Sequence, residues 1–153
     1  MASQRIYIGT YTERLPFVDG KAEGIYIYDL DMDSGELIKI GHTNGPRNPS
    51  YLALEPQRHV LYAVQETVVG DSPSVHAYAI EDKTLRKINE QPAHGGLPCH
   101  IVADSTGQWV ISANYETGSV AVYPIKVDGA VGEATTVIQH EGSSIDASRQ
   151  EGP

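Results

Sequence analysis

An internal repeat of about fifty residues constrains the fold of this chain more than any other feature of its sequence. The segment NPSYLALEPQRHVLYAVQE at 48–66 has a rewritten copy, LPCHIVADSTGQWVISANYE, that begins at residue 97. Tyr28, Tyr78 and Tyr123 hold the same place in three shorter similar segments, IYIYDL, VHAYAI and VAVYPI, at separations of 50 and 45 residues. Repeats of this length indicate stacked supersecondary units. We therefore expect three such units.

Each unit has the composition of a set of β-strands. Short apolar or alternating runs rich in Val, Ile and Tyr are separated by Gly, Asp, Asn and Pro, and no window keeps a helical apolar stripe. The second unit predicts strands at about 49–54, 59–65, 74–80 and 85–91. The third predicts strands at about 98–103, 109–114, 119–125 and 134–139. The first predicts only three, at about 5–10, 24–30 and 36–41.

Four antiparallel strands in a unit of this length are typical of a propeller blade, because radial repetition leaves only short, protected sheet edges. The missing first strand of the first unit is what ring closure requires if a later segment supplies it. Propellers have about 4 to 8 blades, so three units do not close a ring. We expect an all-β fold in which residues 1–153 form one partial β-propeller domain. Its blade units lie at about 5–42, 48–92 and 97–140, and 141–153 is a loop leading to a further blade.

Composition and charge narrow the class of partner. Lys and Arg number 11 against 20 Asp and Glu, for a formal net charge of -9, and no basic run interrupts this acidity. We therefore expect no nucleic-acid partner and no membrane-surface partner. The sequence shows neither a secretory signal nor 18 consecutive apolar residues, which favours a cytoplasmic location. Cys99 is the only cysteine, so an internal disulfide is excluded and a reducing compartment fits.

The loops of an antiparallel meander alternate between the two ends of a blade. One end carries plain turn sequences rich in Gly, Asp, Ser and Pro, to which we assign no function. The other end gathers the chemically interesting side chains. These are Arg47, Asn48, Glu66, His94, His100, Asn114, Tyr115, His140, Glu141, Arg149 and Glu151.

Several of these residues also have a purely structural interpretation. His100 replaces Tyr51 of the second unit, and a half-buried histidine bonded to a nearby carbonyl would be ordinary. Asn114 could supply a left-handed turn residue after its strand. Cys99 is expected to be a small buried filler, because only His100 lies near enough in sequence to activate a thiolate.

The remaining charged residues at this end divide into two groups. Glu66, Glu116 and Glu141 are expected to be solvated charges. Arg149 and Glu151 lie in a Gly-containing stretch before a predicted strand, where a guanidinium and a carboxylate suit anion binding and proton transfer.

Motifs of other enzyme classes are absent from the sequence. It contains no GxSxG elbow, no GxxxxGK[ST] loop, no HExxH and no EF-hand loop. His94, His100 and His140 are far apart in sequence, so a metal site would need tertiary coincidence. We expect no metal and no cofactor.

The chain resembles the seven-bladed propeller lactonases, a family that includes bacterial 6-phosphogluconolactonase and the fungal carboxy-cis,cis-muconate cyclases. The matching motifs run through the whole chain in family order. They are GTYT (9–12), GIYIYDLD with SGEL (24–37), NPSYLAL (48–54), LYAVQE (61–66), PCH (98–100), ANY (113–115), GSVAVYPI (118–125) and QHEGS with RQEGP (139–153). The resemblance implies about three blades of an expected seven, with the active cleft on the loop-rich end.

The resemblance also implies site residues and a reaction. His100, Arg149 and Glu151 are the implied catalytic residues. Arg47, Asn48, Asn114, Tyr115, His140 and Glu141 are the implied substrate-binding residues. The expected reaction is metal-free hydrolysis of a sugar δ-lactone, 6-phosphogluconolactone to 6-phosphogluconate in the pentose phosphate pathway. A histidine or Glu151 would be the general base, and Arg149 would hold a phosphate or the developing oxyanion.

Two other functions stay open from the sequence. A muconate-type cyclase would use the same cleft to form a lactone, and a non-catalytic propeller would bind proteins, because a fold does not determine a function. Three units leave open blade faces, so self-association through these faces is also an expectation. The truncated chain alone could then be inactive.

Overall fold

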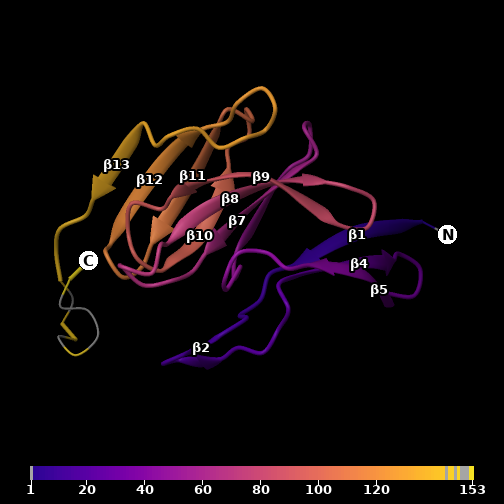
Figure 1. The fold of residues 1–153 in the computed structure, drawn as a ribbon, viewed down its shortest axis with the longest axis horizontal. Helices are drawn as coiled ribbons and strands as arrows, with labels where there is room; N and C mark the ends of the chain where they lie inside the picture. The colour runs from indigo at the N-terminus through magenta and orange to yellow at the C-terminus, as the bar shows by residue number, and fades with distance from the viewer. Residues whose placement is uncertain (1, 144, 147, 149–151) are drawn as a thin grey trace.

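The computed structural model describes residues 2–143, 145–146, 148 and 152–153, and every regular element in this part of the chain is a β-strand. Three antiparallel sheets follow one another along the chain (Figure 1). The first contains β1 (Ser3–Ile8), β4 (Ile25–Asp31) and β5 (Leu37–Thr43), in the order β1-β4-β5. These described residues contain no helix long and apolar enough to cross a membrane.

The second and third sheets have four strands each, in sequence order. The second consists of β6 (Leu52–Glu55), β7 (Val60–Gln65), β8 (Ser74–Ile80) and β9 (Leu85–Pro92). The third consists of β10 (Pro98–Ala103), β11 (Trp109–Asn114), β12 (Ser119–Pro124) and β13 (Thr136–Gln139). The prediction of an all-β fold built from antiparallel four-stranded sheets is confirmed.

The predicted strands all exist, with shifts at their ends. The largest is in the second unit, where the strand expected at 49–54 begins only at Leu52. A turn delays it, because the Ser50 N–H donates to the Asn48 carbonyl over 2.7 Å and Asn48 has a φ of 48°. The sequence did not predict the small hairpin of β2 (Arg14–Leu15) and β3 (Val18–Asp19), which projects from the first sheet (Figure 1).

The core consists of two apolar layers, one on each face of the middle sheet. In β7, Val60, Tyr62 and Val64 belong to a cluster with residues of the third sheet, whereas Leu61 and Ala63 belong to a cluster with residues of the first. All five are fully or almost fully buried. Successive side chains of a strand point to opposite faces, so a strand covered on both sides needs an unbroken apolar run. The sequence VLYAV meets this requirement.

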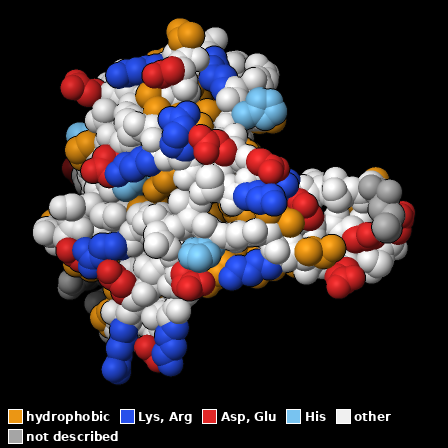
Figure 2. Space-filling view, turned by 45° about the vertical axis from the view of Figure 1, so that its right-hand side comes forward, with side chains coloured by type: hydrophobic (Ala, Val, Ile, Leu, Met, Phe, Trp, Pro, Cys, Tyr) orange, Lys and Arg blue, Asp and Glu red, His pale blue; other side chains and the backbone are white. Residues whose placement is uncertain are grey.

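Basic and acidic side chains are mixed on one face of the molecule. On the face shown in Figure 2, lysine and arginine side chains are interspersed with acidic ones. Several cations are held in ion pairs, such as Arg5 with Asp29 and Arg86 with Glu81.

Candidate active site

The first strands of neighbouring sheets bring Tyr51 and His100 together. Their ring centroids are 4.4 Å apart with an interplanar angle of 46°, and both side chains are exposed. Tyr51 directly precedes β6, and His100 lies in β10, which contacts both β6 and β7. The alternative interpretation, in which His100 is a half-buried structural histidine, is therefore wrong. Its imidazole is open to a ligand.

A β-bulge sets the position of His100. Pro98 pairs with Asn114 and His100 pairs with Ala113, so Cys99 is the extra residue between two ladder pairs. Bulges re-aim side chains, and they are common next to active sites. The Cys99 thiol is partly buried and lies 3.9 Å from the Ala113 carbonyl. Burial first, and then the charge of Glu66, raises its pKa, so Cys99 is a protonated spacer rather than a nucleophile.

Glu66 is buried, with 5% of its surface exposed, so the prediction of a solvated charge is wrong for this residue. The Tyr11 hydroxyl lies 3.0 and 3.1 Å from its two carboxylate oxygens, and the Ser50 hydroxyl donates a further hydrogen bond. Burial, followed by the hydrogen bond to Glu66, raises the pKa of Tyr11 to about 12. Ser50 adjoins Tyr51 in the chain, so this network anchors the segment that positions Tyr51 beside His100.

Asn48 is fully buried, and its side chain bonds to the protein. Its Oδ1 accepts from the backbone N–H groups of Thr12 and Glu13, both at 3.0 Å, and its Nδ2 donates to the Glu66 carbonyl at 3.2 Å. Its backbone is left-handed, as is that of Leu97 at the equivalent place before Pro98. These contacts favour a structural role for Asn48, which ties the loop after β1 to the second sheet.

Arg47 is already paired with carboxylates. Its guanidinium donates to both oxygens of Glu13 at 2.7 and 2.8 Å and lies 2.6 Å from Asp71. Hydrogen bonds to Asp71 and Glu13 raise its pKa, so it is always charged. Two carboxylates leave this group with a net negative charge, which does not suit a phosphate.

Three predicted binding residues line one cleft of about 570 Å³, namely Asn114, Tyr115 and His140, together with Gly152 and Pro153. Tyr115 is exposed, and its N–H donates to the Leu97 carbonyl at 2.9 Å. The predicted Glu141 is exposed beside His140.

Asn114 is buried in this cleft wall at the end of β11, and its φ is not positive, so the turn-residue alternative is wrong. Its Nδ2 donates to the Ala93 carbonyl at 2.9 Å and to the Ser119 hydroxyl at 3.1 Å. Its Oδ1 accepts no hydrogen bond within the described part of the chain. A buried acceptor without a partner is costly, so this oxygen is a weak point of the cleft wall.

The two remaining predicted catalytic residues, Arg149 and Glu151, lie outside the described residues. Within 2–143, 145–146, 148 and 152–153, no group of three His, Cys, Asp or Glu side chains is arranged to hold a metal ion. Tyr11 and Ser50 were not among the predicted site residues. The only signal for Tyr11 was its place in the GTYT motif, and for Ser50 its place in NPSYLAL.

Comparison with known proteins places this arrangement in a family. A family model described as "Lactonase, 7-bladed beta-propeller" matches residues 5–153. The 6-phosphogluconolactonase of Bacillus subtilis (strain 168) is 32% identical over 149 residues, which cover 96% of this chain and 40% of that protein.

Solved structures show the same likeness. A Bacteroides fragilis NCTC 9343 protein provisionally named 6-phosphogluconolactonase superposes with a TM-score of 0.87 at 33% identity, over 99% of this chain and 40% of the other. The periplasmic gluconolactonase of Pseudomonas aeruginosa gives a TM-score of 0.79 at 26% identity, over 94% of this chain and 40% of the other. The chain thus spans about 40% of the length of these relatives. The chain belongs to the family of seven-bladed β-propeller lactonases.

Proposed function

We propose that the whole protein hydrolyses a sugar δ-lactone, with 6-phosphogluconolactone as substrate. The observation that carries this proposal is the exposed imidazole of His100, set by a bulge at the start of an inner strand, in a chain whose named relatives are lactonases. A histidine ordinarily titrates near neutrality, which suits a general base at physiological pH.

The proposed reaction needs a base, an anion-binding group and water. His100 or Glu151 removes a proton from the attacking water, and the water oxygen bonds to the lactone carbonyl carbon. Arg149 stabilises the oxyanion or holds the substrate's phosphate. The ring C–O bond then breaks, and the released alkoxide takes up the proton to give the open hydroxy acid. Tyr115, His140 and Glu141 form the proposed sugar-binding wall, with the Asn114 carbonyl oxygen as acceptor.

The choice between phosphorylated and free sugar lactone is open to a direct test. One relative is named a gluconolactonase, without a phosphate. We would measure kcat/KM of the whole protein for 6-phosphogluconolactone and for glucono-δ-lactone, each corrected for spontaneous hydrolysis. A ratio of about 10- to 150-fold in favour of the phosphorylated substrate supports the proposal, because a charge-assisted contact contributes about 1.5–3 kcal/mol. Equal values would still agree with lactone hydrolysis but would contradict a preference for the phosphorylated substrate.

Arg149 provides the second arm of this test. Arg149→Ala should remove most turnover, whereas Arg149→Lys should recover part of it, because lysine keeps the charge without the bidentate fork. An unchanged rate in Arg149→Ala would exclude Arg149 from the mechanism.

A cytoplasmic location stays a prediction, which cell fractionation would check. Self-association through the open sheet faces also stays a prediction, which light scattering would check.

A further inference from the structure

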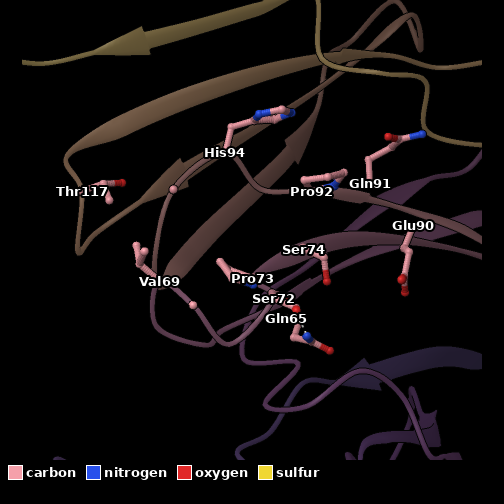
Figure 3. Close-up of a pocket in the computed structure, with 12 residues that line it drawn as sticks. Gln65, Val69, Ser72, Pro73, Ser74, Glu90, Gln91, Pro92, His94 and Thr117 are labelled. Carbon is pink, nitrogen blue, oxygen red and sulfur yellow. Dashed lines mark hydrogen bonds between the residues drawn. The ribbon is translucent and has the colours of Figure 1, made fainter.

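A wide cleft lies beside the candidate active site and shares no residue with the cleft of Asn114, Tyr115 and His140. It has a volume of about 820 Å³ and is formed by the loop after β7, the ends of β8 and β9, and the loop before β10 (Figure 3). Val69, Pro73 and Pro92 provide apolar walls, and Gln65 and Thr117 provide hydrogen-bonding groups. Mixed apolar and neutral polar walls are typical of small-molecule sites.

Two residues of this cleft wall, Ser74 and Glu90, flank the buried imidazole of His76. The Ser74 Oγ lies 2.9 Å from His76 Nε2, and the His76 Nδ1 lies 3.5 Å from the Glu90 Oε2. Ser74 and Glu90 line the cleft, and Figure 3 shows their side chains pointing to the same side. Glu90 and His76 also line a smaller adjoining cleft of about 390 Å³.

Strand geometry explains this alignment. Ser74 and His76 are two residues apart in β8, so their side chains share one face of the sheet. Glu90 is the direct cross-strand partner of His76 in β9, which places its carboxylate beside the ring. Tyr78, two residues further along β8, stacks beside the imidazole at a centroid distance of 6.2 Å. The register of one hairpin therefore sets all three groups.

The histidine has the protonation state that a general base requires. It is 3% exposed, and its Nδ1 has no hydrogen-bond partner within the described part of the chain. Burial lowers the pKa of His76 to about 4, and the charge of Lys87 adds a smaller lowering effect. The charge of Glu90 acts in the opposite direction but is outweighed. The ring is thus neutral at pH 7. In the tautomer that carries its hydrogen on Nδ1, Nε2 accepts the proton of Ser74.

We propose that Ser74, His76 and Glu90 form a second, nucleophilic site that hydrolyses small esters bound in the 820 Å³ cleft. Nucleophile, base and acid follow one another across the hairpin, with the carboxylate of Glu90 at 3.5 Å from the imidazole in charge contact rather than in a hydrogen bond. This site is independent of the proposed lactonase function, because none of its residues belongs to the candidate active site.

The reaction proceeds in two balanced steps. Ser74 Oγ bonds to the ester carbonyl carbon while its proton passes to His76 Nε2. The bond to the alcohol oxygen then breaks, and the alcohol leaves with that proton. Water attacks the acyl-serine in the same way, giving up its proton through His76 to Ser74 and releasing the carboxylic acid. Glu90 stays ionised and stabilises the imidazolium; its own pKa is lowered, chiefly by the hydrogen bond from Lys87.

A fluorophosphonate probe tests the nucleophile directly. Whole protein is treated with the probe and digested, and the modified serine is located by mass spectrometry. We expect phosphonylation of Ser74 that is absent from Ser74→Ala and slowed about 10²-fold in His76→Gln. Glu90→Gln, which changes a half-exposed residue and so keeps the fold, should also slow labelling. Failure to modify Ser74 in the folded wild-type protein overturns the proposal.

Ser112→Ala is the matched control. Ser112 is fully buried on β11 and Ser74 is almost fully buried on β8, but no histidine lies within hydrogen-bond distance of the Ser112 hydroxyl among the described residues. This variant should label and hydrolyse 4-nitrophenyl acetate like the wild type, whereas Ser74→Ala should lose turnover of that ester. Glucono-δ-lactone hydrolysis, measured in the same samples, should be unchanged in Ser74→Ala. If a folded Ser74→Ala variant lost lactone hydrolysis together with ester hydrolysis, a separate site would be contradicted.

Discussion

The ring of Tyr51 packs against the imidazole of His100 at a centroid distance of 4.4 Å, and the two residues hold equivalent positions in successive repeats. The repeat itself creates this contact, because equivalent positions on the first strands of adjacent sheets face the same axis. Between the two copies, one aromatic ring has been exchanged for a group that can transfer protons. The rest of the unit keeps its pattern of strands and turns.

His100→Ala should lower kcat for lactone hydrolysis by about 10²-fold or more, the usual contribution of a general base. The assay follows acid release in the whole protein. The matched control is His94→Asn, which changes another exposed histidine at the same end and suits its left-handed φ of 57°. A kcat that falls equally in both variants would point to a general loss of structure rather than to a base.

The strands were predictable because their signals are local. In β7 the run VLYAV lies between turn residues, and in β11 and β12 the buried residues recur at every second position. The β2–β3 hairpin was not predictable, since each strand has only two residues and no apolar alternation.

The site was less predictable than the strands because its contacts join distant segments. The burial of Glu66 depends on Tyr11, 55 positions earlier in the chain. The pairing of Arg47 with Glu13 and Asp71 likewise depends on how two loops meet. The sequence placed these residues at the correct end of the sheets, but only the packing shows which are buried and which are exposed.

Tyr11→Phe should lower the free energy of unfolding by about 1–3 kcal/mol, because it removes a hydrogen bond to a buried charged group. Tyr26→Phe is the control. Tyr26 also lies near a glutamate, but its hydroxyl is 3.4 Å from the exposed Glu23, so its loss should cost less than about 0.5 kcal/mol. Urea unfolding measures both. Equal effects would show that burial of Glu66 adds nothing to this bond.

Asn48→Ala should destabilise the protein by about 2–4 kcal/mol. It leaves two half-buried N–H groups without an acceptor, and alanine tolerates a φ of 48° less well than asparagine does. Asn48→Gly removes the same hydrogen bonds without the backbone strain. It should therefore be about 1 kcal/mol less destabilising than Asn48→Ala. Thermal and urea unfolding of the pair check this order. If the two variants were equally stable, the left-handed backbone would carry no cost.

His76 should make stability depend on pH between its two pKa values. Burial lowers its folded-state pKa to about 4, below the ordinary 6.5, so the unfolded chain binds the proton more readily. The contribution of the neutral ring to the free energy of unfolding is therefore fully present above pH 6.5. It falls by about 3 kcal/mol in all as the pH drops toward 4.

The difference between wild type and His76→Gln isolates this effect. Glutamine has no proton to gain, whereas carboxylates with lowered pKa values, such as Asp104 at about 2 and Glu90, titrate mainly at lower pH and are present in both proteins. Urea unfolding at intervals from pH 7.5 to 4.5 should give curves for the two proteins that converge as the pH falls. The neutral imidazole bonded to Ser74 is the state on which the proposed ester hydrolysis depends. Parallel curves would mean that the folded protein accepts a proton on His76 as readily as the unfolded chain does. Burial would then not lower the pKa of this ring.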